Sequence, residues 1–295
     1  MHPATVASNG IEIAYETFGA PDARPLLLVM GLGAQMLAWH PEWCEALAAR
    51  DFFVIRYDNR DVGLSTHLHH APRPNLFAAW NGDFSSASYR LEDMAEDAVG
   101  LLDALGLDRA HVVGASLGGM IAQTMAITHP ERVRSLTSMM STPWVGIGSP
   151  TPEARAALMA PPPTNRTQAI ERAVRNQKIL GSPGYPPDEA WIREVAGQAY
   201  DRGFDPLGVA RQQLAIWASG DRTKALARVT APALVVHGDA DPLIRLAGGL
   251  ATAAALPDAE LLVIPGMGHN LPRPVWPTLV AAISRLADRA EASHR

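Results

Sequence analysis

Cysteine is nearly absent from this sequence, which excludes one common way of stabilising a fold. The 295 residues contain one cysteine, Cys44, so no disulfide can form within the chain. Its neighbours, Trp43-Cys44-Glu45-Ala46-Leu47, have the pattern of an amphipathic helix. We therefore expect Cys44 to be a core residue on a helix that packs against the rest of the protein.

Long apolar runs and clusters of basic residues are also missing. No uninterrupted apolar stretch is long enough to span a bilayer, and the net charge is -5. Without a lysine-rich segment or a basic patch, neither nucleic acid nor an anionic membrane is an expected partner. The first residues contain no charged segment followed by an apolar one, so we expect no secretory signal and a cytoplasmic location.

What the sequence does contain is a regular alternation of strand-like and helix-like segments. Hydrophobic residues make up 47% of the chain, enough for one large core and a smaller insertion. Asn9-Gly10, between two alternating runs, predicts an N-terminal hairpin over residues 5–8 and 11–18. Further segments, read as parallel strands and the helices between them, predict an α/β fold with a mostly parallel, doubly wound sheet. The expected strands are 26–30, 53–57, 111–114, 136–140, 233–237 and 261–264, and the expected helices are 42–50, 91–105 and 117–129.

The alternation breaks between Ser141 and Val229. Prolines cluster there, among them Pro161-Pro162-Pro163, and helices are expected near 167–180, 189–200 and 208–219. We predict that residues 139–228 form a helical cap, or lid, inserted after the sixth strand. The core then comprises residues 1–138 and 229–295.

One short motif carries the chemistry of this sequence. Gly114-Ala115-Ser116-Leu117-Gly118 reads G-x-S-x-G directly after a strand-like run and directly before a helical one. This is the pattern of a sharp strand-to-helix turn that holds a serine exposed at the edge of a sheet. Glycines are needed on both sides because the backbone approaches neighbouring elements closely. Ser116 is therefore the expected nucleophile.

A serine needs an acid and a base to become nucleophilic, and both follow at the ends of later strands. The run that ends at His237 leads into Gly238-Asp239-Ala240-Asp241-Pro242, and the run that ends at Ile264 leads into Pro265-Gly266-Met267-Gly268-His269. We predict that His269 accepts the serine proton and that Asp241 orients the imidazole. Asp239 is the alternative acid. His111 lies inside a strand and is interpreted as a core residue.

With these segments and those at residues 26–33 and 54–65, the sequence resembles the α/β-hydrolase superfamily. The resemblance spans nearly the whole chain and is strongest to the esterase-like branch that includes the anthracycline methylesterases. It implies the α/β-hydrolase fold and an oxyanion hole formed by the backbone N–H groups of Leu32 and Leu117. It also supports Asp241, which stands three residues after Gly238, as the acid. Met30 stands where a histidine usually precedes the loop glycine, although the anthracycline methylesterases are similar in lacking it.

The substrate pocket is expected beneath the cap. Its expected lining residues are Met140, Trp144 and Trp217, which would suit a bulky apolar group. The connection over residues 67–89, with Phe77, Trp80 and Phe84, is unusually long. It is either a second wall of the pocket or a surface loop.

Two other groups of residues have the residue types of metal ligands. His237, Asp239 and Asp241 share one face of an extended strand end. The run His67-Leu68-His69-His70 has histidines at a ligand-like spacing but lacks matching distant ligands. Both are better explained without a metal, the first as the acid turn and the second as a surface loop, so we expect no metal and no cofactor.

These residues predict a carboxylesterase that acts on a small-molecule ester or lactone through an acyl-enzyme intermediate. Acyl-homoserine lactone opening, carbon-carbon bond hydrolysis and cofactor-free perhydrolysis use the same residues and stay open. A receptor that binds a ligand without turnover is the alternative outside enzymes. A homo-oligomer is also compatible with the sequence.

Overall fold

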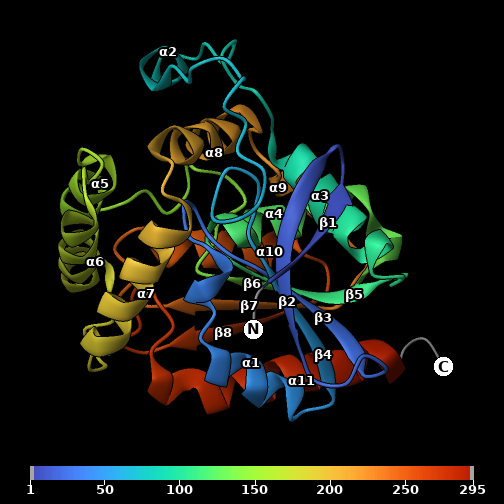
Figure 1. Ribbon diagram of the computed structural model, residues 1–295. Helices are drawn as coiled ribbons and strands as arrows, with labels where there is room; N and C mark the ends of the chain where they lie inside the picture. The colour runs from blue at the N-terminus through green and yellow to red at the C-terminus, as the bar shows by residue number, and fades with distance from the viewer. Residues whose placement is uncertain (1–2, 293–295) are drawn as a thin grey trace.

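The computed structural model describes residues 3–292, and its centre is one eight-stranded sheet (Figure 1). The strands lie side by side in the order β1-β2-β4-β3-β5-β6-β7-β8. From β4 to β8 all neighbours are parallel, whereas β2 is antiparallel to both β1 and β4. The strands are β1 Ala4–Ser8, β2 Ile11–Phe18, β3 Arg24–Val29, β4 Phe52–Tyr57, β5 Ala110–Ala115, β6 Val133–Met139, β7 Ala233–Gly238 and β8 Ala259–Ile264.

The predicted sheet and its N-terminal hairpin are confirmed. Asn9 and Gly10 both have positive φ, 47° and 78°, which a tight two-residue hairpin turn requires. The central strands are buried on both faces, because alternate residues of one strand enter different cores. In β3, Leu27 and Val29 belong to one core, while Leu28 belongs to the other.

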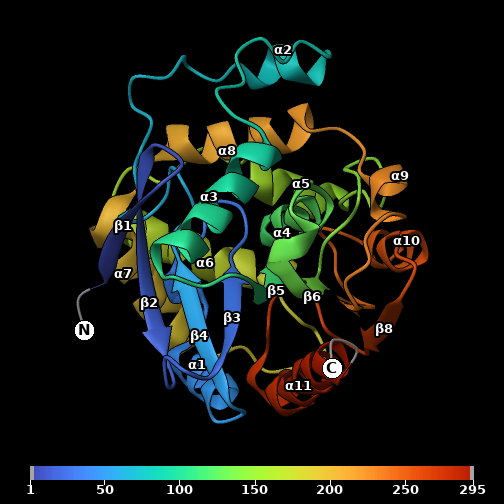
Figure 2. The same ribbon diagram turned by 90° about the vertical axis from the view of Figure 1, so that its right-hand side faces the viewer.

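Helices cover both faces of the sheet (Figure 2). The first core packs beneath α3 (Leu91–Ala104) and α4 (Leu117–Thr128), and the second beneath α1 (Pro41–Ala48) and α11 (Trp276–Ala292). Shorter elements complete the core: η1 Met36–Ala38, η2 Pro130–Arg132, α9 Thr223–Leu226, α10 Ala247–Ala255 and η3 Arg273–Val275. This doubly wound arrangement brings the loops after β3, β5, β7 and β8 to one edge of the sheet.

Four helices occupy the segment that the sequence assigns to the cap. They are α5 Pro152–Met159, α6 Arg166–Leu180, α7 Glu189–Gly203 and α8 Pro206–Ala218. The sequence predicted the last three but not α5, because its prolines were interpreted as breaks. Pro152 lies in the first turn of α5, where the missing N–H costs nothing, and Thr151 caps the helix. The boundaries at residues 139 and 228 stay a prediction.

The long connection after β4 also contains a short helix, α2 (Leu76–Trp80), which stands above α8 in both views (Figures 1 and 2). Within residues 3–292, no helix is both long enough and apolar enough to cross a membrane.

Candidate active site

Ser116 lies in a sharp turn between β5 and α4. Its φ is 56°, a left-handed conformation that a serine adopts only under strain. A Cβ on Gly114 would collide with the Gly118 carbonyl oxygen, and one on Gly118 would collide with the carbonyl oxygen of Val29. The two motif glycines are therefore required by close backbone approach, as the sequence predicted.

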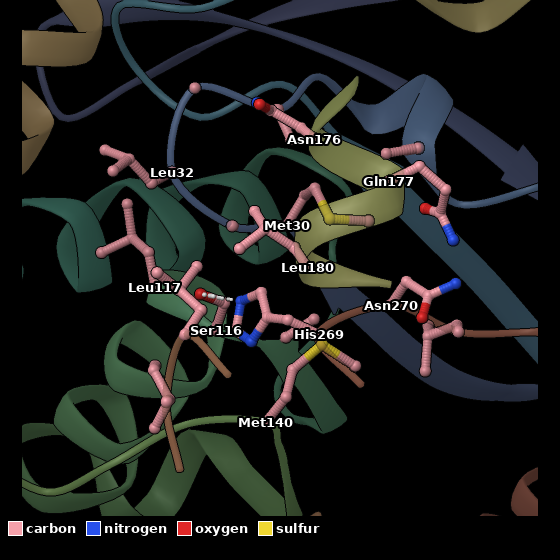
Figure 3. Close-up of a pocket in the computed structure, with 18 of the residues that line it drawn as sticks. Met30, Leu32, Ser116, Leu117, Met140, Asn176, Gln177, Leu180, His269 and Asn270 are labelled. Atoms are coloured by element: carbon pink, nitrogen blue, oxygen red, sulfur yellow. Dashed lines mark hydrogen bonds between the residues drawn. The ribbon is translucent and has the colours of Figure 1, made fainter. Parts of the chain in front are cut away.

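His269 joins Ser116 to Asp241, and Figure 3 shows its hydrogen bond with Ser116. The Oγ atom of Ser116 lies 3.0 Å from Nε2 of His269, and Nδ1 of His269 lies 2.7 Å from Oδ2 of Asp241. With the proton on Nδ1 facing the carboxylate, Nε2 is free to accept from the serine. Asp241 is buried, and its Oδ1 accepts from the N–H groups of Leu243 and Ile244. The carboxylate is thus fixed in position, and it in turn fixes the imidazole.

The geometry separates Asp241 from its alternative, Asp239. Oδ1 of Asp239 accepts from the backbone N–H of Gly266, and the residue is exposed. His237 is buried, with Nε2 2.7 Å from the carbonyl oxygen of Ile244, and burial lowers the pKa of its imidazole. Because its ring N–H donates to the Ile244 carbonyl, His237 helps to hold the acid turn, the segment over residues 238–244 that carries Asp241. Within residues 3–292, these three side chains do not converge as metal ligands.

The oxyanion hole at the backbone N–H groups of Leu32 and Leu117 stays a prediction, and the structure shows where these two residues lie. Leu32 and Leu117 lie on the opposite side of Ser116 from His269 in Figure 3. Among the described residues, neither N–H donates a hydrogen bond. Gly31 lets the first loop come close, since a Cβ there would stand 3.2 Å from Cβ of Ser116. Both donors are therefore available to an oxygen that binds at Ser116.

Sequence reasoning missed the residue that holds this loop from the cap. Gln212 is buried on α8, its Oε1 accepts from the N–H of Gly33 at 2.9 Å, and its Nε2 donates to the carbonyl of Arg60. From the core side, Asn59 donates to the carbonyl of Met30 at 2.9 Å. Met30 itself packs in the second core. A buried glutamine on an apolar helix face is a signal that the sequence offers, but only the fold shows its partner.

A cavity of about 1330 Å³ includes Ser116 and His269 in its wall. That volume exceeds the roughly 300–1,000 Å³ typical of small-molecule pockets. Asn176, Gln177 and Leu180 of α6 lie across it from Ser116 (Figure 3). The other residues of the four cap helices in the wall are Arg155, Leu158, Met159, Ala173, Trp191, Ile192, Val195, Ala196, Ala199, Gln213, Ile216 and Trp217.

Two of the three predicted pocket residues line this cavity, Met140 and Trp217, but Trp144 does not. The prediction for Trp144 is wrong because the chain turns back just after β6. Thr142 Oγ1 and the N–H of Ile147 both donate to the Trp144 carbonyl, at 2.8 and 2.9 Å. The turn lays the indole over Gly146 at the surface, where Trp144 is 42% exposed.

The sequence showed no distant ligand to match the histidine run over residues 67–70. In the fold, the carboxylate of Asp205 lies close to this run. Within residues 3–292, one group could converge on a metal ion, namely His67, His69 and Asp205. Oδ2 of Asp205 lies 3.1 Å from Nδ1 of His67 and equally 3.1 Å from Nη2 of Arg211. The guanidinium of Arg211 already pairs with this oxygen. We therefore conclude that the cluster holds the loop with His67 and His69 against the start of α8.

Two further residues that the sequence placed in the core are buried there. His111 lies in β5 with Nδ1 2.8 Å from Oγ of Ser135, and burial lowers the pKa of the imidazole to about 3. Cys44 lies on α1, and burial raises the pKa of its thiol to about 12. Neither residue lines the cavity, so both interpretations are confirmed.

The family model for the alpha/beta hydrolase fold matches residues 24–272. The chain belongs to the α/β-hydrolase family. It is 31% identical to rhodomycin D methylesterase DauP of Streptomyces sp. (strain C5) and 30% identical to rhodomycin D methylesterase DnrP of Streptomyces peucetius. Each match covers 96% of this chain and 97% of the relative. The chain therefore falls among methylesterase-like α/β hydrolases, as the sequence motifs indicated.

Solved structures agree with this assignment. The enol-lactonase from Burkholderia xenovorans LB400 superposes with a TM-score of 0.74 at 25% identity, covering 96% of this chain and 99% of that one. Together the family model and the relatives support an enzyme of the ester-cleaving α/β-hydrolase type.

Proposed function

We propose that this protein is a carboxylesterase that cleaves its substrate through a covalent ester on Ser116. The observation that carries the proposal is the pair of hydrogen bonds that link Asp241 to His269 and His269 to Ser116 in the wall of a large cavity. The three residues come from separate loops, after β7, β8 and β5. Their convergence supports a serine, histidine and aspartate acting together.

Each residue has one role in the proposed reaction. Ser116 Oγ attacks the ester carbonyl carbon while Nε2 of His269 accepts its proton, and Asp241 stabilises the imidazolium. The oxyanion accepts from the N–H groups of Leu32 and Leu117. His269 then donates its proton to the departing alkoxide. A water molecule repeats the sequence on the acyl-enzyme and releases the acid.

The proposed substrate is a methyl ester, or a lactone, of a bulky hydrophobic molecule. The cavity is large, and its wall includes apolar side chains from all four cap helices. The methylesterase relatives support a methyl ester, and the enol-lactonase likeness supports a lactone as a second candidate. Both substrates need the same attack on a carbonyl and the same stabilised oxyanion.

A p-nitrophenyl ester series of rising acyl length, assayed with wild type and Ser116→Ala in parallel, tests the proposal. We expect the wild type to hydrolyse the series and Ser116→Ala to fold normally and lose nearly all activity, by about 10⁶-fold. The preferred acyl length would measure the usable depth of the cavity. Full activity in Ser116→Ala would overturn the serine mechanism. A folded wild type that cleaves no ester in the series would direct the assay to lactones, carbon-carbon substrates or ligand binding without turnover.

A further inference from the structure

The helix α2 has one side chain that reaches the cavity and another that does not. Trp80 is 69% exposed, yet it lines the same cavity as Ser116 and His269. Phe77, three residues earlier, is 81% exposed and is not in the cavity wall. The two aromatic residues therefore differ in position although they share one short helix.

The segment around α2 holds itself together mainly by its own hydrogen bonds. Asn75 caps the helix by accepting from the N–H of Ala78, and Asn75 N–H donates to Oγ of Ser86 across the loop. After the helix, Asp83 N–H donates to the carbonyl of Ala78. These bonds form a compact loop that keeps its shape and presents Trp80 at a defined place.

Trp80 meets the cap at Trp217 of α8. Their ring centroids are 6.1 Å apart with planes at 69°, an edge-to-face contact. Trp217 is itself part of the cavity wall, as is Gln213 one turn earlier on the same face of α8. Figures 1 and 2 both show α2 directly above α8. The cavity is therefore bounded by an aromatic pair where core loop and cap helix meet.

We propose that Trp80 and Trp217 form a remote subsite for a flat aromatic portion of the substrate, distinct from the position of the reacting ester. A ring that enters here would cover the indole of Trp80, most of whose surface is open to solvent. Gln213 supplies an amide that can bond to an oxygen substituent on that ring. The contact Trp80–Trp217 already has the geometry that aromatic rings favour, so a third ring adds to it without rearrangement.

This inference rests on the proposed esterase function and refines its substrate class. The large volume of the cavity is what makes the subsite necessary: a small ester would fill only part of it. Binding energy from a remote ring would position the carbonyl at Ser116. Substrates with an aromatic group should therefore have a higher kcat/KM than aliphatic substrates of equal size. This difference in kcat/KM should depend on Trp80.

The test compares Trp80→Ala with Phe77→Ala, a matched aromatic deletion on the same helix. The substrates are three methyl esters, methyl 4-(pyren-1-yl)butanoate, methyl hexadecanoate and methyl acetate, of which only the first is aromatic. For Trp80→Ala we expect the ratio of kcat/KM for the pyrenyl ester to that for the acetate to fall by about 3- to 10-fold, mainly through KM. Trp80→Phe should recover most of the loss. Phe77→Ala should leave the pyrenyl ratio nearly unchanged, and Trp80→Ala should leave the ratio of kcat/KM for the hexadecanoate to that for the acetate nearly unchanged.

Binding to Ser116→Ala separates the subsite from the chemistry. Pyrene fluorescence gives the Kd of the pyrenyl ester for this variant and for the same variant carrying Trp80→Ala. A weaker Kd on loss of Trp80 supports the subsite even if no ester is cleaved. An unchanged Kd and an unchanged kcat/KM ratio would overturn it, as would equal losses in Phe77→Ala. A matching fall for all three esters would also overturn it, because it would indicate a general structural role.

Discussion

At the residue scale, the two oxygens of the Asp241 carboxylate have different partners, one the imidazole of His269 and the other the backbone. Oδ2 of Asp241 faces His269, while Oδ1 is occupied by two backbone N–H groups. His237 ties the acid turn through the Ile244 carbonyl. A carboxylate with both oxygens committed cannot rotate away, so the imidazole keeps the tautomer that a serine nucleophile needs.

This arrangement predicts unequal effects of two neighbouring substitutions. Asp241→Asn should lower kcat by about 10⁴-fold, because the amide favours the wrong imidazole tautomer. Asp239→Asn should cost far less, since within residues 3–292 this side chain bonds only to the N–H of Gly266. The measurement is steady-state hydrolysis of one p-nitrophenyl ester by both variants. The reverse order of losses would move the acid to Asp239.

At the element scale, the loop that carries Leu32 depends on two partners in different elements. Asn59 holds it from the end of β4, and Gln212 holds it from α8 of the cap. The common family pattern has a histidine where this chain has Met30. Here the side chain packs in the core and hydrogen bonds to the loop backbone do the tethering. The cap therefore contributes to the geometry of the proposed oxyanion hole as well as to the pocket.

A substitution of Gln212 tests whether the cap positions the loop that carries Leu32. We expect Gln212→Ala to lower kcat by about 10- to 100-fold, because Leu32 N–H would no longer be held where the oxyanion forms. Gln198→Ala is the matched control, since Gln198 is exposed on α7 and, in the described part of the chain, its side chain bonds only to Glu194. The readout is kcat and KM on one ester, with circular dichroism to compare folding. A change in KM with kcat unaltered would contradict a role in loop positioning.

At the scale of the whole molecule, buried ion pairs join the cap to the core. Asp61 follows β4 and is fully buried, and its carboxylate accepts two hydrogen bonds from Arg211 of α8, at 2.8 and 2.7 Å. Tyr89 donates to the same carboxylate at 2.8 Å. Arg202 of α7 similarly pairs with buried Asp58 at 3.0 Å. These pairs set where α7 and α8 lie over the sheet.

Breaking one such pair should destabilise the protein much more than breaking a surface pair. Asp61→Ala removes two of the hydrogen bonds of buried Arg211 and leaves only its longer pair with Asp205 among the described residues, so we expect the free energy of unfolding to fall by about 3 kcal/mol. Asp288 has a carboxylate that is 67% exposed and pairs with Arg24 at the surface. Asp288→Ala removes this pair and should lower the free energy of unfolding by about 1 kcal/mol or less. Urea unfolding of both variants measures the difference. Equal losses would show that Arg211 finds another acceptor or water.

Much of the fold was predictable because its signals are local. Strands buried on both faces read as apolar runs, and the Asn9-Gly10 turn and the elbow around Ser116 need specific residue types at fixed positions. Helix α5 was missed because proline is a breaker inside a helix but acceptable at its first turn. The prediction for Trp144 was wrong because a turn of a few residues lays its indole over Gly146 at the surface.

The sequence by itself determined the order of the elements and the family, and it singled out Ser116, Asp241 and His269, because motif and chain order are written along the chain. Only the tertiary structure decided which distant side chains meet. The contacts of Gln212 with Gly33, of Asp205 with His67 and of Trp80 with the edge or face of Trp217 all join residues far apart in the chain. Contacts of this kind depend on how the cap packs over the sheet, which no local pattern encodes.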